Sequence, residues 1–249
     1  MEHDDVQVGR VLSRREALTL LGAGGVGGAA ALATPGPAAA KARPGYRLPA
    51  CIVRPEQTEG PYFLDTELDR SDIRSDPSDD FVCEGARLAL AFQVSRIDAQ
   101  ACEPLGGALV DVWQCDAAGV YSGVEDIGGR FDSTGKRFLR GHQVTDRDGV
   151  ARFTTIYPGW YRGRTVHIHF KIRTDPGASA GHEFTSQLYF DDALTDRVFE
   201  TGPYAANAGR RTRNPDDRIY RNGGSQLLLD VTEDGDGYRA LFDIGLQIG

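Results

Sequence analysis

The chain has 249 residues and a formal net charge of −8 at pH 7. An acidic protein of this kind offers no phosphate-seeking surface, so the composition argues against nucleic acid as a partner.

The first forty residues contain the three parts of an export signal. Residues 13–18 carry a twin-arginine pattern around Arg14 and Arg15, an apolar Gly/Ala-rich stretch follows at residues 20–33, and small residues occupy 38–40. The apolar stretch is shorter than the ~20 residues that a membrane span needs. A lipoprotein site at Cys51 is less favoured, because residues 41–47, which include Lys41, Arg43 and Arg47, separate that cysteine from the apolar stretch.

We therefore predict that residues 1–40 are a cleaved twin-arginine signal and that residues 41–249 form a single domain. Its size suits one sandwich or barrel. No membrane span is expected after cleavage. The expected location is extracellular, in the cell envelope or in the periplasm.

Four cysteines follow the signal: Cys51, Cys83, Cys102 and Cys115. An even number in an exported chain predicts two disulfides, and three pairings are possible. Four buried thiols are the alternative. None of the cysteines has the C-x-x-C spacing of a thiolate zinc site.

Beyond the signal, short runs of alternating or β-branched residues are separated by Pro/Gly-rich turns, which is typical of a β-sandwich or barrel. We expect a short helix at residues 192–199, a surface loop at 203–216, and a hairpin turn at 233–237. The fold class predicted is all-β, a two-sheet β-sandwich with long active-site loops and few short helices. Strands are expected at residues 87–94, 108–113, 151–156, 166–172, 186–190, 226–231 and 238–246.

A His-x-His pattern at His167 and His169 is the first indication of chemistry. Side chains alternate along a strand, so the two imidazoles point to one face and can reach the same metal ion. Only four histidines follow the signal. Histidine pairs of this spacing also occur as packing or hydrogen-bonded residues, so the spacing alone leaves both interpretations open.

The neighbouring motifs resemble the intradiol ring-cleaving dioxygenases, the family of protocatechuate 3,4-dioxygenase and catechol 1,2-dioxygenase. Pro-Gly-Trp-Tyr at residues 158–161 and Arg-Thr-Val-His-Ile-His at 164–169 resemble the family's iron-binding signature. Residues 107–122 resemble its upstream signature, 58–63 its pocket-lining segment, and 186–190 the strand after the histidines. The resemblance covers roughly residues 50–192, and the chain is most similar to an exported, single-domain branch.

The resemblance implies an oxidoreductase whose mononuclear non-haem Fe(III) has four protein ligands: Tyr121, Tyr161, His167 and His169. It also implies catalytic roles for Arg164, Gln187 and Tyr161, the last being the ligand that substrate displaces. Because Arg164 precedes the histidines by an odd number of residues, it must lie in the loop before the strand. Tyr62 and Trp113 are candidate substrate-binding walls, although either could be a core aromatic residue.

The implied reaction opens a catechol-type ring with O2 between the two hydroxyl-bearing carbons and gives a cis,cis-muconate-type product. Charge supports this ligand set, because phenolate is a hard anion that suits Fe(III). Two phenolates and a hydroxide cancel three positive charges, as do a doubly deprotonated catechol and one phenolate.

Two other functions remain open from the sequence. One is an extracytoplasmic ligand- or carbohydrate-binding sandwich, and the other is a zinc or copper hydrolase that uses the histidine pair. The preferred catechol and the oligomeric state are not predicted.

Overall fold

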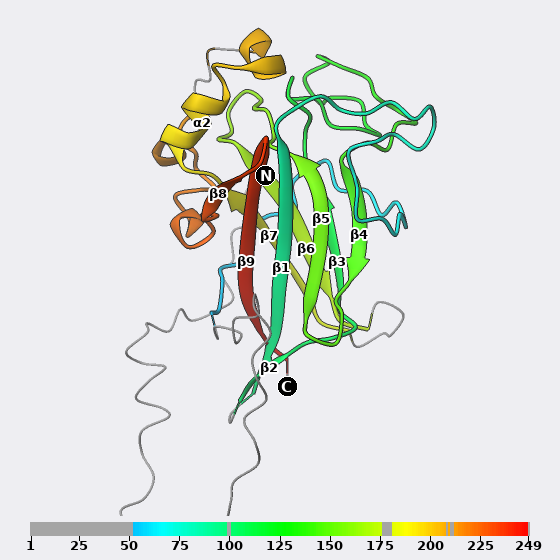
Figure 1. Cartoon of the computed structure of the whole chain (residues 1–249), viewed down its shortest axis with the longest axis vertical. Coiled ribbons are helices and arrows are strands. Elements are labelled where there is room, and N and C mark those ends of the chain that lie inside the picture. The colour runs from blue at the N-terminus through cyan, green and yellow to red at the C-terminus, as the bar shows by residue number, and fades with distance from the viewer. Residues whose placement is uncertain (1–51, 99–100, 176–180, 208, 210–211, 249) are drawn as a thin grey trace, which may run out of the picture. The chain divides into compact units, whose positions relative to one another are not determined.

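In the part of the chain that the structure describes, nine strands form two sheets that face each other, with α2 and the long loops at one end (Figure 1). The structure is a computed structural model that describes residues 52–98, 101–175, 181–207, 209 and 212–248. The predicted signal, including its boundary after residue 40, lies outside these residues.

The first sheet has five strands and is organised around β1 (Arg87–Ile97). This strand pairs in parallel with β9 (Gly237–Gln247) and antiparallel with both β5 (Val150–Ile156) and β2 (Cys102–Pro104). At the edge, β8 (Val231–Asp234) forms a hairpin with β9.

The second sheet has four antiparallel strands in the order β4-β3-β6-β7. These are β4 (Arg140–Val144), β3 (Leu109–Trp113), β6 (His167–Arg173) and β7 (Glu183–Tyr189). Both faces of β6 are buried, which is why its sequence combines apolar residues with buried polar ones.

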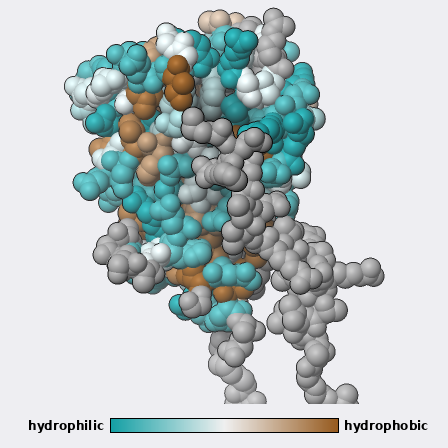
Figure 2. All heavy atoms as spheres, turned by 180° about the vertical axis from the view of Figure 1, so that it is seen from behind, coloured by the Kyte–Doolittle hydropathy of each residue, from teal (hydrophilic) through white to brown (hydrophobic). Residues whose placement is uncertain are grey.

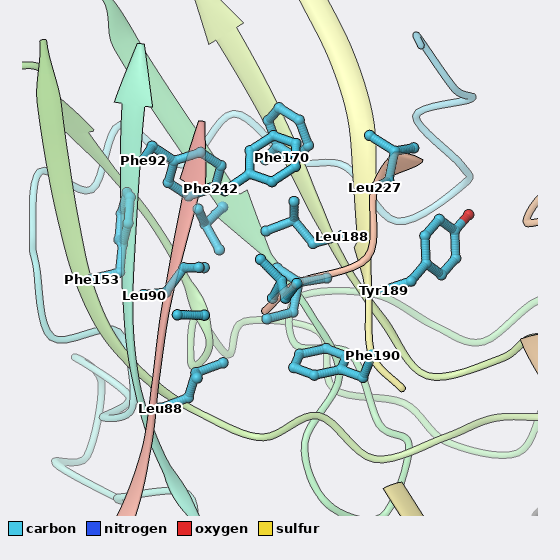
Figure 3. Packing of buried hydrophobic residues seen from close by; sticks show 14 of the residues in the cluster. Leu88, Leu90, Phe92, Phe153, Phe170, Leu188, Tyr189, Phe190, Leu227 and Phe242 are labelled. Carbon is cyan, nitrogen blue, oxygen red and sulfur yellow. The ribbon is translucent and has the colours of Figure 1, made fainter. Parts of the chain in front are cut away.

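The main core lies between the sheets. Phe92 of β1, Phe170 of β6 and Phe242 of β9 are each no more than 1% exposed, and their ring centroids lie 5.2 to 6.0 Å apart. Figure 3 shows these three rings together with Leu90 and Leu188, whereas the labelled Tyr189 directs its hydroxyl away from them. The inner face of β6 is thereby fixed, which leaves its other face for the polar residues.

Helices are short, as expected. The helix α2 spans Asp192–Val198. Asp191 is its N-cap, and the Asp191 carboxylate accepts a hydrogen bond from the Leu194 amide. Three 3₁₀ turns complete the described helices: η1 (Gly202–Asn207), η2 (Asn214–Asp216) and η3 (Gly224–Gln226).

The predicted sandwich, the helix at residues 192–199 and the final hairpin are confirmed. Two local predictions are wrong. Most of the strand expected at 226–231 is replaced by η3 and the segment after it, and the surface loop expected at 203–216 contains η1 and η2, with Tyr204 and Asn214 buried. The short strands β2 and β4 were not predicted.

The expectation of two disulfides is also wrong. Cys102 is disulfide-bonded, but Cys83 and Cys115 are free and buried. Both free thiols lie in hydrophobic clusters, where burial raises their pKa. They behave as small apolar core residues. Cys51 lies outside the described residues.

Seen from behind, hydrophobic residues form small patches separated by hydrophilic ones (Figure 2). In the part of the chain that the structure describes, no helix has the length and apolar character needed to cross a membrane.

Candidate metal centre

The outer face of the second sheet carries one row of side chains from four strands. The register pairs Arg140 with Trp113, Trp113 with His169, and His169 with Gln187. All four side chains are no more than 2% exposed. The Trp113 ring stacks on the His169 ring, with centroids 5.0 Å apart and an interplanar angle of 9°.

The imidazoles of His167 and His169 lie close together, because side chains two residues apart on β6 point to the same face of the sheet. Nε2 of His167 lies 3.1 Å from Nε2 of His169. Nδ1 of His167 lies 2.6 Å from the Thr165 carbonyl oxygen, which can only accept, so this nitrogen carries the proton. Burial holds the pKa of both imidazoles well below the usual range, and the nearby Arg164 charge adds to this effect. Both rings are therefore neutral, and Nε2 of His167 presents its lone pair to the centre.

The hydroxyl groups of Tyr121 and Tyr161, which lie in two different loops, both approach Nε2 of His167. Their hydroxyl oxygens lie 3.5 Å and 3.2 Å from Nε2 of His167. The two loops are in contact, because the Gly159 amide donates to the Asp116 carbonyl. A Cβ at Gly119 would lie 2.2 Å from the Trp160 carbonyl oxygen, so the close approach of the loops requires glycine.

This arrangement fits a single metal ion. Bonds of about 2.1 Å to nitrogen and oxygen place neighbouring ligand atoms about 3 to 3.5 Å apart, and the measured separations are 3.1 to 3.5 Å. No group of three or more His, Cys, Asp or Glu side chains with metal-binding geometry occurs among the described residues. The two tyrosine hydroxyls are oxygen donors within 3.5 Å of Nε2 of His167, so they can complete the ligand set of the two imidazoles.

The phenols are protonated until a cation arrives. Burial raises the pKa of Tyr161 to about 12 and that of Tyr121 well above its ordinary value. A bound cation lowers the pKa of a coordinated group, so binding would release these protons. Two phenolates with two neutral imidazoles form a hard, anionic donor set that suits Fe(III).

Arg164 lies in the loop before β6, as predicted. Its Nη1 is 3.3 Å from Nε2 of His167, and its Nη2 donates to Oε1 of Gln187 at 2.5 Å. Gln187 in turn donates through Nε2 to the Thr58 carbonyl at 2.9 Å. Two of the three predicted catalytic side chains, Arg164 and Gln187, therefore contact each other, and Arg164 is the one that lies beside His167.

Tyr62 and Trp113 both line the centre. The Tyr62 ring lies 4.7 Å from the Tyr121 ring, and its hydroxyl donates to Asp126 at 2.7 Å. Both aromatic residues are also core residues, since they belong to one buried cluster with Tyr121. The structure thus brings together every site residue predicted from the sequence.

Asp217 contacts the candidate centre but was not predicted from the sequence. Its carboxylate accepts from Nε of Arg164 at 2.8 Å, and it lies outside every motif that suggested the site. No local pattern indicates it, because it lies 53 residues from its partner.

Comparison with known proteins agrees with this geometry. Residues 58–210 match the protein family described as Dioxygenase. The intradiol ring-cleavage dioxygenase of Tetranychus urticae is 30% identical, with a TM-score of 0.68, and the alignment covers 79% of this chain and 95% of that one. The chain belongs to the intradiol ring-cleavage dioxygenase family.

Three further relatives of the chain are bacterial. The dioxygenase domain of a carbohydrate-binding fusion protein from Streptomyces sp. SirexAA-E is 31% identical, with a TM-score of 0.56, over 80% of this chain and all of that domain. The protocatechuate 3,4-dioxygenase beta chain of Burkholderia cepacia is 34% identical over 58% of this chain. The chlorocatechol 1,2-dioxygenase of Pseudomonas putida is 32% identical over 36%. These two matches span only 59% and 37% of the relatives' own lengths.

Proposed function

We propose that this intradiol dioxygenase opens catechol-type rings with O2 at one Fe(III) ion held by Tyr121, Tyr161, His167 and His169. The observation that carries the proposal is the convergence of two hydroxyl oxygens and two imidazole nitrogens around Nε2 of His167. When bound, the ion would hold the deprotonated catechol and activate its ring toward O2. The product would be a cis,cis-muconate-type acid.

The difference in burial between the two tyrosines supports separate roles. Tyr121 is 1% exposed, whereas Tyr161 is half-buried. Tyr161, the more exposed of the two, would be the ligand that a catechol displaces. Its phenolate oxygen would take up one of the two hydroxyl protons of the substrate, and the hydroxide that completes the charge balance would take up the other. Tyr121 would remain as the second phenolate ligand because its side chain is buried.

Arg164 is the group that stabilises negative charge on the bound ring. Its guanidinium lies beside His167, in a site where electrostatic interactions are weakly screened. Gln187 acts through Arg164, because its amide oxygen accepts from the guanidinium and its amide nitrogen is tied to Thr58. Tyr62 and Trp113 form walls that exclude water.

The test is to load the purified protein with iron and to measure O2 uptake and products with catechol, protocatechuate, hydroxyquinol and 4-substituted catechols. We expect ring-opened muconate-type products from at least one of these compounds, and none from a His167→Ala variant. A colourless iron-treated protein that opens none of them would contradict the proposal and favour a binding function.

We also propose export by the twin-arginine route, on the basis of Arg14 and Arg15. Replacing both with lysine keeps the charge of the signal but removes the twin-arginine pattern. In a bacterial host, the wild type should appear outside the cytoplasm, and the Arg14→Lys/Arg15→Lys variant should remain inside. Equal export of the two proteins would contradict this route.

A further inference from the structure

Asp217 is a buried carboxylate with four hydrogen-bond donors around it. Oδ2 accepts from Nε of Arg164 and from the Thr165 amide, each at 2.8 Å. Oδ1 accepts from the amides of Ile219 and Tyr220, at 2.7 Å and 3.1 Å. The Asp217 side chain is 1% exposed. Such a carboxylate connects its own turn to the start of β6.

This carboxylate completes the set of contacts that orient the Arg164 guanidinium. A guanidinium is planar, so contacts to two or more of its nitrogens fix its direction. Nε is held by Asp217, Nη2 by Gln187, and Nη1 is left facing Nε2 of His167. Without Asp217, the guanidinium could rotate about its remaining contact with Gln187.

Asp217 also sets the charge near the centre. The Arg164 side chain is 14% exposed, and a cation this deeply buried is unfavourable without a counter-ion. The pair is formally neutral. Arg164 can therefore lie beside the His167 imidazole, with Nη1 facing Nε2 of that ring.

We propose that Asp217 is a positioning residue that aims Arg164 at the reacting ring, an inference that rests on the function proposed above. Asp217 lies beyond the residues 58–210 that match the family, yet it contacts Arg164. Asn214 supports the same turn differently: it accepts from Thr165 Oγ1 at 2.7 Å and donates to the Phe190 carbonyl at 2.8 Å.

Asparagine cannot replace this carboxylate. An amide has one acceptor oxygen and an NH2 group that only donates. In one orientation the NH2 group would face Arg164 and Thr165, and in the other it would face the amides of Ile219 and Tyr220. Either orientation places donors against donors, so Asp217→Asn should impair the site nearly as much as Asp217→Ala.

The experiment compares Asp217→Ala, Asp217→Asn and Asp217→Glu with two controls in the full-length, iron-loaded protein. Asp216→Asn changes the same charge on the exposed neighbouring residue. Asn214→Ala disturbs the same turn without a contact to Arg164. The measurements are kcat, KM, iron stoichiometry, the visible band, the dissociation constant for 4-nitrocatechol and the thermal midpoint. Asp217→Glu keeps the charge and supplies a folded variant if the other two are unstable.

We expect kcat to fall by about 10- to 100-fold in the Asp217 variants, the usual effect of losing a group that orients a catalytic residue. Iron stoichiometry and 4-nitrocatechol affinity should change less than threefold. Both controls should keep kcat within about threefold of the wild type. In an Arg164→Ala background, Asp217→Ala should cause no further loss of kcat, because the two residues act as one unit.

Three results would overturn the inference: a wild-type kcat in folded Asp217 variants, an equal loss of kcat in Asn214→Ala, or an undiminished effect of Asp217→Ala when Arg164 is absent. A wild-type protein that opens no catechol at all would instead refute the proposed function, and this inference with it.

Discussion

Gly60→Ala is the substitution that most directly probes how tightly the candidate centre is packed. Gly60 has a φ of +74°, and a Cβ built there would lie 3.2 Å from Cε1 of His169. That carbon is bonded to Nε2, the nitrogen that faces the centre. The His169 ring is 2% exposed and stacked on Trp113, so it has little room to move away.

The expected magnitude has two parts. An alanine in the left-handed region costs roughly 1 to 2 kcal/mol of folding stability. Carbon atoms prefer separations of about 3.5 to 4.0 Å, so the new methyl group must displace the imidazole by a few tenths of an ångström. Gly135→Ala separates the two parts, because Gly135 has a φ of +87° and nothing within 4 Å of its would-be Cβ.

The assay is a chelator-competition titration of iron, together with thermal unfolding of the metal-free protein. Both variants should lose about 1 to 2 kcal/mol of stability. Only Gly60→Ala should also bind iron more weakly, by about 10- to 100-fold, as is usual when a group that orients a ligand is disturbed. Equal iron affinity in the two variants would refute the reasoning that Gly60 packs against a metal ligand.

Three further predictions concern the core, the thiols and pH. Phe170→Ala should lower the free energy of unfolding by about 3 to 5 kcal/mol in urea titrations, whereas Phe81→Ala, at a site 54% exposed, should change it little; similar losses would contradict the assigned core. A maleimide reagent at pH 8, with labelling measured by mass spectrometry, should label Cys83 and Cys115 only after unfolding, since both are buried and the pKa of Cys83 is raised to about 12. Labelling of either thiol in the folded protein would argue against their assigned burial. Burial raises the pKa of Asp111 to about 6 from an ordinary value of 3.8, so its contribution to stability is full below about pH 4 and is lost as the pH rises through 6. The thermal midpoint of the wild type relative to Asp111→Asn should therefore fall from pH 4 to pH 7, and a constant difference would refute the assignment.

The fold was predictable where strands alternate on a clear apolar face. In β1, Leu88, Leu90 and Phe92 all point into the core, and the sequence shows this period directly. The strand β4 was missed because its buried residues include Arg140, which is held by Ser122 rather than by apolar packing. The apolar residues at 227–229 favour a strand by their sequence, but in the structure they follow η3 as an irregular buried segment.

The site residues were predictable where they lie close together in the sequence. His167 and His169 occupy one strand, and Tyr161 and Arg164 precede them by a few residues, so a short motif contains most of the centre. Tyr121 required the second motif. The position of Asp217 depends on how a distant turn packs against the start of β6, and a polar residue in a Gly/Asn/Arg-rich segment gives no sign of burial.

An iron titration of the purified protein followed by visible and resonance Raman spectra tests the central claim most directly. Binding of one Fe(III) per chain should produce a tyrosinate-to-iron charge-transfer band. Tyr121→Phe and Tyr161→Phe should each alter the band, and Tyr189→Phe should leave it in place. A protein that binds iron without such a band, or whose band survives the loss of both Tyr121 and Tyr161, would contradict a centre built from two phenolates and two imidazoles.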